Sequence, residues 1–152
     1  MPMATFQSNM DHDTFIGKVQ QRADLANRGE ADTATRATLT TLGERIQAGE
    51  ADDLASQLPV EIDRYLEEAD SGQRFDFEEF ATRVADRVEL DSLADRPGQL
   101  AQAVMSVVAD ATGTGELQDV VTHLPQGEGY GRLLDFAEEE PEIDEEEVPE
   151  RD

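Results

Sequence analysis

The sequence of 152 residues contains no cysteine, a single lysine (Lys18) and no long apolar run. Without cysteine the chain can form no disulfide framework and can carry out no thiolate chemistry. No stretch of about 18 apolar residues is present, so we expect no membrane-spanning helix. A charged and then apolar leader is also missing, and we therefore expect no secretory signal peptide and a cytoplasmic location.

Basic residues are scarce. The chain has 12 of them against 36 acidic residues, and its formal net charge is -24. Such a charge repels phosphates and anionic lipids, so we expect neither nucleic acid nor a membrane surface as a partner. An acidic surface with arginine in place of lysine indicates a high-salt cytoplasm, because at molar salt the Debye length falls to about 3 Å and screens the repulsion. The alternative interpretation is an ordinary acidic protein with an acidic tail.

What the sequence does contain is one segment that occurs twice. Residues 49–59 and 115–125, which we call the hinge segments, share Gly, Glu, Asp and a final Leu-Pro at equivalent positions. In each copy we expect the glycine to end one helix, an acidic turn to begin the next and Leu-Pro to stop it. Gly49 is predicted to be a left-handed C′ residue. Leu58 and Leu124 are predicted to be buried at equivalent positions.

Apolar residues at helical spacing predict an all-α fold, and no alternating β-branched run predicts a strand. The expected helices are one capped by Asp13 and broken at 27–29, one over 32–48, one over 50–58, one opened by Pro59, one capped by Asp76, one capped by Asp95 with Pro97 in its first turn, one in the second hinge segment, and a last one with Tyr130, Leu133, Leu134 and Phe136.

The helices repeat as well as the hinge segments. An offset of 65 residues aligns Phe15 with Phe80, and an offset of 66 aligns Leu42 with Val108. We therefore predict a bundle of about eight helices, built from two tandem four-helix repeats with pseudo-two-fold symmetry. The predicted organisation is a disordered segment over 1–10, a helical domain over 11–136 (repeat one 11–69, repeat two 75–136) and a disordered acidic tail over 137–152. The tail holds ten acids and one arginine, too little apolar surface to order it.

The repeated pattern resembles a known family, the uncharacterised two-repeat helical proteins catalogued as domain of unknown function 2267. The residues that carry the resemblance are Phe15, Val19, Ala37, Leu39, Leu42, Gly49, Glu50, Asp53, Leu54, Gln57, Leu58 and Pro59, with their second-repeat counterparts. The resemblance covers about residues 11–136. It implies an all-α fold and no catalytic residues.

Four duplicated carboxylates are the candidate metal ligands: Glu50 and Asp53 in the first hinge segment, Glu116 and Asp119 in the second. Carboxylates in the first turn of a helix are stabilised by its free N–H groups, by about 0.3–1 kcal/mol each. That structural role is one interpretation. The other is that the two helix starts approach each other and share a hard divalent cation such as Ca²⁺ or Mg²⁺.

The two histidines give no further chemistry. We expect His12 to be exposed at an acidic chain start, and His123 to make a helix-end hydrogen bond, since the first hinge segment has Gln57 at that position. No nucleophile elbow, P-loop, zinc or calcium motif is present. We therefore expect no catalytic residue and no cofactor.

These observations favour a non-enzymatic protein-interaction or structural module, a monomer or homodimer that engages a protein partner through an apolar groove. The alternative is a divalent-metal-dependent protein or enzyme that uses the four carboxylates. A third class, a phosphate-mimicking inhibitor of nucleic-acid proteins, would require the charge to be arrayed along one surface.

Overall fold

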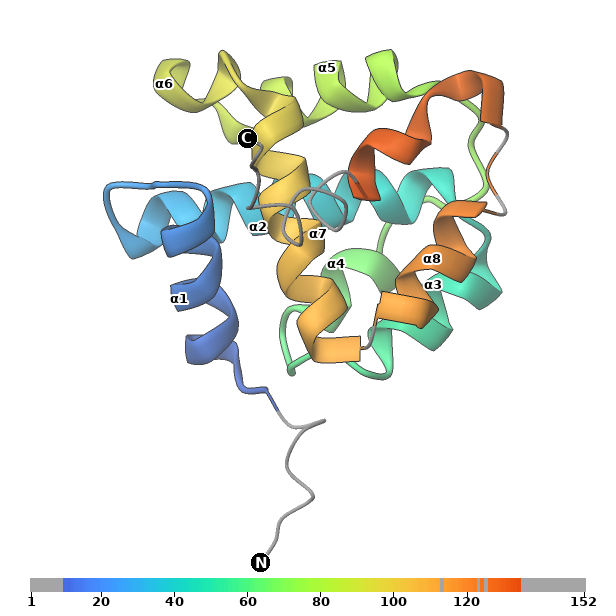
Figure 1. Cartoon of the computed structure of the whole chain (residues 1–152), viewed down its shortest axis with the longest axis horizontal. Coiled ribbons are helices and arrows are strands. Elements are labelled where there is room, and N and C mark those ends of the chain that lie inside the picture. The colour runs from blue at the N-terminus through green and yellow to red at the C-terminus, as the bar shows by residue number, and fades with distance from the viewer. Residues whose placement is uncertain (1–9, 113, 123, 125, 135–152) are drawn as a thin grey trace, which may run out of the picture.

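A computed structural model of the chain describes residues 10–112, 114–122, 124 and 126–134, and this part consists of helices joined by turns and loops, without a strand (Figure 1). Its elements are α1 (His12–Arg22), α2 (Arg28–Arg45), α3 (Ala48–Ala55), α4 (Asp63–Glu67), α5 (Phe77–Val88), α6 (Asp91–Ala94), α7 (Pro97–Thr112), α8 (Thr114–Thr122), and the 3-10 helices η2 (Gln126–Glu128) and η3 (Tyr130–Leu134). In this part of the chain, no helix has the length and apolarity needed to cross a membrane.

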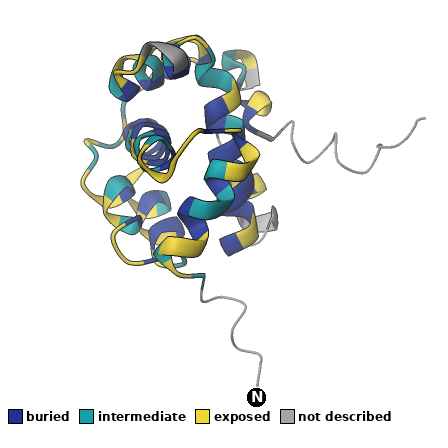
Figure 2. Ribbon diagram, turned by 90° about the vertical axis from the view of Figure 1, so that its left-hand side faces the viewer, coloured by how far each residue is buried: buried dark blue, intermediate teal, exposed yellow. Residues whose placement is uncertain are grey.

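Helices α2 and α7 cross at the centre of the molecule (Figure 1). The α2 sequence is rich in alanine and threonine, whose small side chains let neighbours approach from several sides. Its buried residues accordingly lie around most of its circumference. In the view of Figure 2, turned by 90°, this helix is seen nearly end-on with other helices around it. The result is one continuous apolar core.

The outer helices pack on this crossing. Both α1 and α5 contact both central helices. Helix α5 is amphipathic: Phe77, Phe80, Val84 and Val88 recur every three or four residues and face the core. Helix α4 packs on α2 and α3, η3 packs on α7 and α8, and α3 contacts α8.

Asp76 is the N-cap of α5, as predicted, and its carboxylate accepts a hydrogen bond of 2.9 Å from the Glu79 N–H. The expected cap of the first helix was wrong by two residues. Asp11, not Asp13, caps α1 and accepts from the Thr14 N–H at 2.8 Å. Asp11 and Asp76 lie 65 residues apart, which is the offset that also aligns Phe15 with Phe80. The predicted cap Asp13 does not fit this offset.

The predicted break at 27–29 is a helix start. Asn27 caps α2 by accepting from the Glu30 N–H at 2.9 Å, and the helix begins at Arg28 rather than near Asp32. Glycine in a first helical turn is tolerated when a good N-cap precedes it, which explains why Gly29 does not interrupt the helix.

The role predicted for Gly49 was also wrong. Helix α2 ends at Arg45, Ile46 is extended, and Gln47 is the N-cap of α3. Gly49 therefore lies in the first turn of α3 and not at a left-handed C′ position. Leu58 and Leu124, in contrast, are both buried, as predicted.

The C-terminal part differs most from expectation. The last segment forms η2 and η3 instead of an α-helix, and Gly129 between them has a φ of 88°, which breaks a regular helix. A single turn, α6, was not predicted, and Asp95 is its C-cap; Pro97 opens α7, as predicted. The two expected disordered ends, apart from Met10, and Phe136 lie outside the described residues.

Candidate functional site

An open hollow of about 370 Å³ lies between the start of α1 and the end of the first hinge segment. It is lined by Met10, Asp11, His12, Ser56, Gln57, Leu58, Pro59 and Val60. Val60 leaves 78% of its surface exposed, the largest exposed fraction among the large apolar residues of the described chain. Leu58 and Pro59 beside it are buried and form the apolar part of the wall.

A strained turn presents Val60. The Ile62 N–H donates to the Pro59 carbonyl at 3.1 Å, which closes a turn with Val60 and Glu61 at its centre. Glu61 has a φ of 84°, a conformation that favours glycine. A residue other than glycine in this region lowers the stability by about 1–2 kcal/mol. The turn is held by a hydrogen bond of 3.1 Å from the Glu61 N–H to Asp63 Oδ1.

His12 lies beside this turn with 34% of its side chain exposed, less than expected for the exposed histidine that the sequence predicts. Its Nε2 is 3.8 Å from Glu61 Oε1, and its Nδ1 is 3.9 Å from Asp13 Oδ1. The imidazole therefore lies between two exposed carboxylates at the edge of the hollow. His123 lies outside the described residues.

The predicted metal ligands lie on two helices, Glu50 and Asp53 on α3 and Glu116 and Asp119 on α8. Glu50 lies in the first turn of α3 and accepts from the Gln47 N–H at 3.4 Å, while Asp53 and Asp119 are exposed. Among the described residues no group of three potential ligands could hold a metal ion. The Glu116 side chain lies outside that description, so the four-carboxylate site stays a prediction.

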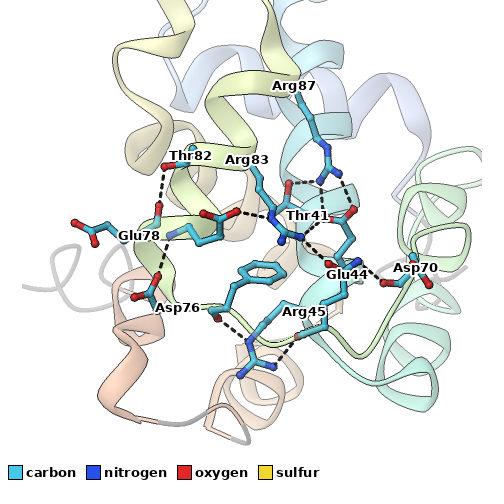
Figure 3. Close-up of polar contacts among 12 residues, drawn as sticks. Thr41, Glu44, Arg45, Asp70, Asp76, Glu78, Thr82, Arg83 and Arg87 are labelled. Carbon is cyan, nitrogen blue, oxygen red and sulfur yellow. Dashed lines mark hydrogen bonds and ion pairs between the residues drawn. The ribbon is translucent and has the colours of Figure 1, made fainter.

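The most extensive polar cluster surrounds Glu44, a nearly buried carboxylate at the end of α2 (Figure 3). Arg87 donates to both of its oxygens, at 2.9 and 2.6 Å, and Arg83 donates to Oε1 at 3.0 Å. Arg87 also donates to the Thr41 hydroxyl at 2.8 Å. The Arg83 guanidinium stacks 3.9 Å from the centre of the Phe75 ring. These contacts fasten α5 to α2.

A second cluster holds α1 to α7. Arg22 donates to Asp110 Oδ2 at 2.6 Å and to the Ser106 hydroxyl at 3.1 Å, and Lys18 donates to the same carboxylate oxygen at 3.2 Å. Lys18 and Arg22 align with Arg83 and Arg87 at the offset of 65, and Glu44 aligns with Asp110 at 66. Each outer helix therefore presents two cations to one carboxylate on a central helix, α1 to Asp110 on α7 and α5 to Glu44 on α2.

Both carboxylates are stabilised in their charged form. Burial by itself would raise the pKa of Glu44, but hydrogen bonds from Arg87 and Arg83 outweigh burial and lower that pKa below its ordinary value. The same balance of burial against hydrogen bonds from Arg22 and Lys18 lowers the pKa of Asp110. The two clusters are therefore charged at neutral pH and fix the orientation of α1 and α5.

A third polar contact ties the C-terminal segment to the segment between α4 and α5. The buried Arg45 donates to the Phe75 carbonyl at 3.0 Å and to Glu128 Oε1 at 2.6 Å. Tyr130 donates to the same carbonyl at 2.6 Å, and burial raises its pKa far above the ordinary value. This contact has no counterpart at the 66-residue offset, where Arg45 aligns with Ala111.

Neither ion cluster was predicted, because outside the hinge segments only apolar positions were aligned. The signal was nonetheless present: basic residues are rare in this chain, and four of them form two i, i+4 pairs separated by 65 residues. The strained turn at Glu61 gave no such signal, because nothing in its local sequence requires a positive φ.

The fold and its contacts define an all-α protein in which two outer helices are held by ion clusters to a crossed central pair. The chain belongs to the family described as Uncharacterized conserved protein (DUF2267), whose model matches residues 12–129. This match confirms the resemblance stated from the sequence. A search of the curated proteins found no match.

Proposed function

We propose that the protein is a non-enzymatic protein-interaction module and that the hollow beside Val60 is its binding surface. The observation that carries this proposal is the exposure of Val60, 78%, beside the buried Leu58 and Pro59 in a hollow whose other lining residues are mostly polar. A hollow with apolar wall residues can take up one anchor side chain of a partner, and such anchors in pockets carry much of the binding energy of interfaces.

The conformation of Glu61 supports the same surface. Glycine would relieve the positive φ at this position, yet the chain has an exposed glutamate there. Strained residues of this kind concentrate at functional sites. At the 66-residue offset Glu61 aligns with Gly127, which lies in η2 without a positive φ. The strained turn therefore belongs to the first repeat alone.

We place this module in a high-salt cytoplasm and describe it as two four-helix repeats related by a pseudo-two-fold axis. The net charge of -24 supports the first statement. The reciprocal ion clusters support the second, as does the packing of the elements, since α1 on α7 mirrors α5 on α2 and α4 on α2 mirrors η3 on α7.

The test is a photo-crosslinking residue placed at Val60, with a matched one at Leu90, the other exposed large apolar residue of the described chain. A protein captured from Val60 but not from Leu90 is then purified, and its affinity is measured for the wild type and for Val60→Asp. We expect the substitution to weaken binding at least tenfold while the circular dichroism melt is unchanged. Equal affinity for both chains would exclude the hollow as the binding surface.

A further inference from the structure

We infer that the occupant of the hollow is a short basic segment of a partner protein, with one large apolar side chain flanked by Arg or Lys. This inference rests on the proposed function and adds the chemistry of the partner. It follows from the polarity of the wall, the charges at the edge and the position of the strained turn.

The wall supplies the anchor point. Met10, Leu58, Pro59 and Val60 line the hollow, and Val60 is the most exposed of the four. A volume of about 370 Å³ is enough for one large side chain and part of its backbone. A single apolar anchor therefore matches the surface better than an extended apolar helix face.

The edge supplies the charge. The side chains of Glu61 and Asp13 are 66% and 87% exposed and lie on either side of His12. The described residues that line the hollow include Asp11 and no arginine or lysine. Asp13 is paired with one basic group, Arg28, whose guanidinium lies 3.2 Å from its carboxylate and is about half exposed. Acidic groups thus outnumber basic ones around the anchor point, and Arg or Lys beside the anchor would complement them.

The turn fixes where the charge lies. Glu61 immediately follows Val60, and its positive φ, together with the hydrogen bond to Asp63, sets the direction of this pair. The carboxylate and the apolar side chain are therefore presented together. A partner that inserts an apolar residue next to Val60 brings its neighbouring residue within reach of Glu61.

Three synthetic 12-residue peptides test the inference. The first has a central Leu flanked by Arg, the second has Ser in place of Leu, and the third has Gln in place of Arg. Binding is followed by NMR with isotope-labelled full-length protein at low and at molar KCl. We expect the first peptide to shift the signals of His12, Leu58 and Val60. Each altered peptide should bind at least fivefold more weakly, and the Leu dependence should persist at molar KCl.

Glu61→Gln and Asp86→Asn provide a matched pair, because each removes one exposed negative charge and Asp86 lies on α5, away from the hollow. We expect Glu61→Gln to weaken the first peptide at least threefold and Asp86→Asn to change its affinity much less. Melting curves confirm that both variants are folded.

The outcomes separate the two proposals. If Val60→Asp weakens binding but the Arg and Gln peptides bind equally, the hollow binds a partner and the basic chemistry is wrong. If neither Val60→Asp nor the loss of the central Leu changes the affinity, both proposals are wrong, since the peptide is then held by net charge alone. Self-association of the protein that Val60→Asp abolishes would make a second copy the occupant and overturn the basic segment.

Discussion

Gly43 shows how one residue sets the distance between two helices. It lies buried in α2 against the end of α4, where an added Cβ would be 2.7 Å from the Ala69 Cβ and 2.8 Å from the Leu66 carbonyl oxygen. The Ala69 side chain is short and the Leu66 carbonyl belongs to the backbone, so neither can move aside. Helices α2 and α4 would therefore have to separate. We expect Gly43→Ala to lower the free energy of unfolding by about 1–3 kcal/mol, measured by urea denaturation.

Gly98 provides the control for this substitution. It lies in the first turn of α7, and an added Cβ there meets no atom within 4 Å. Gly98→Ala should leave stability unchanged or raise it by up to about 1 kcal/mol through helix propensity. Similar losses in both variants would mean that the α2–α4 approach is not closely packed at Gly43.

Thr35 and Thr38 bury hydroxyl oxygens that have no hydrogen-bond partner in the structure. Valine has nearly the same shape and removes the unsatisfied group. We therefore expect Thr35→Val and Thr38→Val to raise the free energy of unfolding by about 1 kcal/mol each. Thr41→Val should do the opposite, because the Thr41 hydroxyl donates to the Ala37 carbonyl and accepts from Arg87, both at 2.8 Å. If all three variants are less stable than the wild type, the hydroxyls of Thr35 and Thr38 are not unsatisfied.

At the scale of the element, α5 is held to α2 by Glu44, and this makes the packing dependent on pH. The pKa of Glu44 is lower in the folded chain than its ordinary value of 4.5. Its stabilisation is therefore complete above about pH 4.5 and is lost as the pH falls through the lowered value. We expect Glu44→Gln to cost about 2–3 kcal/mol at pH 7, because it leaves two guanidinium groups without their carboxylate.

The measurement is the difference in the free energy of unfolding between wild type and Glu44→Gln across pH 7 to 3. This difference should shrink toward low pH, where the wild-type carboxylate becomes protonated. The exposed Asp86→Asn gives the control and should show a small difference throughout. A difference for Glu44→Gln that does not change with pH would show that the cluster stabilises by packing alone.

The elements also show which features the sequence could predict. The apolar spacing of Phe77, Phe80, Val84 and Val88, and the Asp76 cap, are local signals, and α5 follows them closely. The boundaries at Asn27 and Gly49 could not be predicted as well, because a cap and a break use the same residue types. The contacts of Glu44 depend on how α5 packs on α2, and the positive φ of Glu61 depends on the closure of its turn. Neither was deducible from residues adjacent in the chain.

At the scale of the whole molecule, the charge of -24 sets the dependence on salt. Self-repulsion destabilises a compact acidic chain, and KCl screens it over a distance of about 3 Å at molar concentration. Glu44 is nearly buried and its two arginines are only partly exposed, so the same salt screens this cluster less than the exposed surface charges. We therefore expect the melting temperature, measured by circular dichroism, to rise as KCl increases toward molar levels. A melting temperature that is flat or falls would contradict a high-salt origin.

The acidic tail adds charge to the molecule but little surface for recognition. Residues 138–152 carry ten acids and one arginine, with Ile143 and Val148 as their sizeable apolar residues, and removing them changes the net charge from -24 to -15. Long-range attraction accelerates association, whereas contacts in the hollow determine dissociation.

Deleting 138–152 should therefore leave the helical circular dichroism of the body intact and slow association of the Arg-flanked peptide at low salt. The difference in association rate should disappear as KCl rises, with the dissociation rate nearly unchanged in stopped-flow measurements. Loss of binding at molar KCl would instead make the tail the recognition element and the helical body the scaffold that presents it.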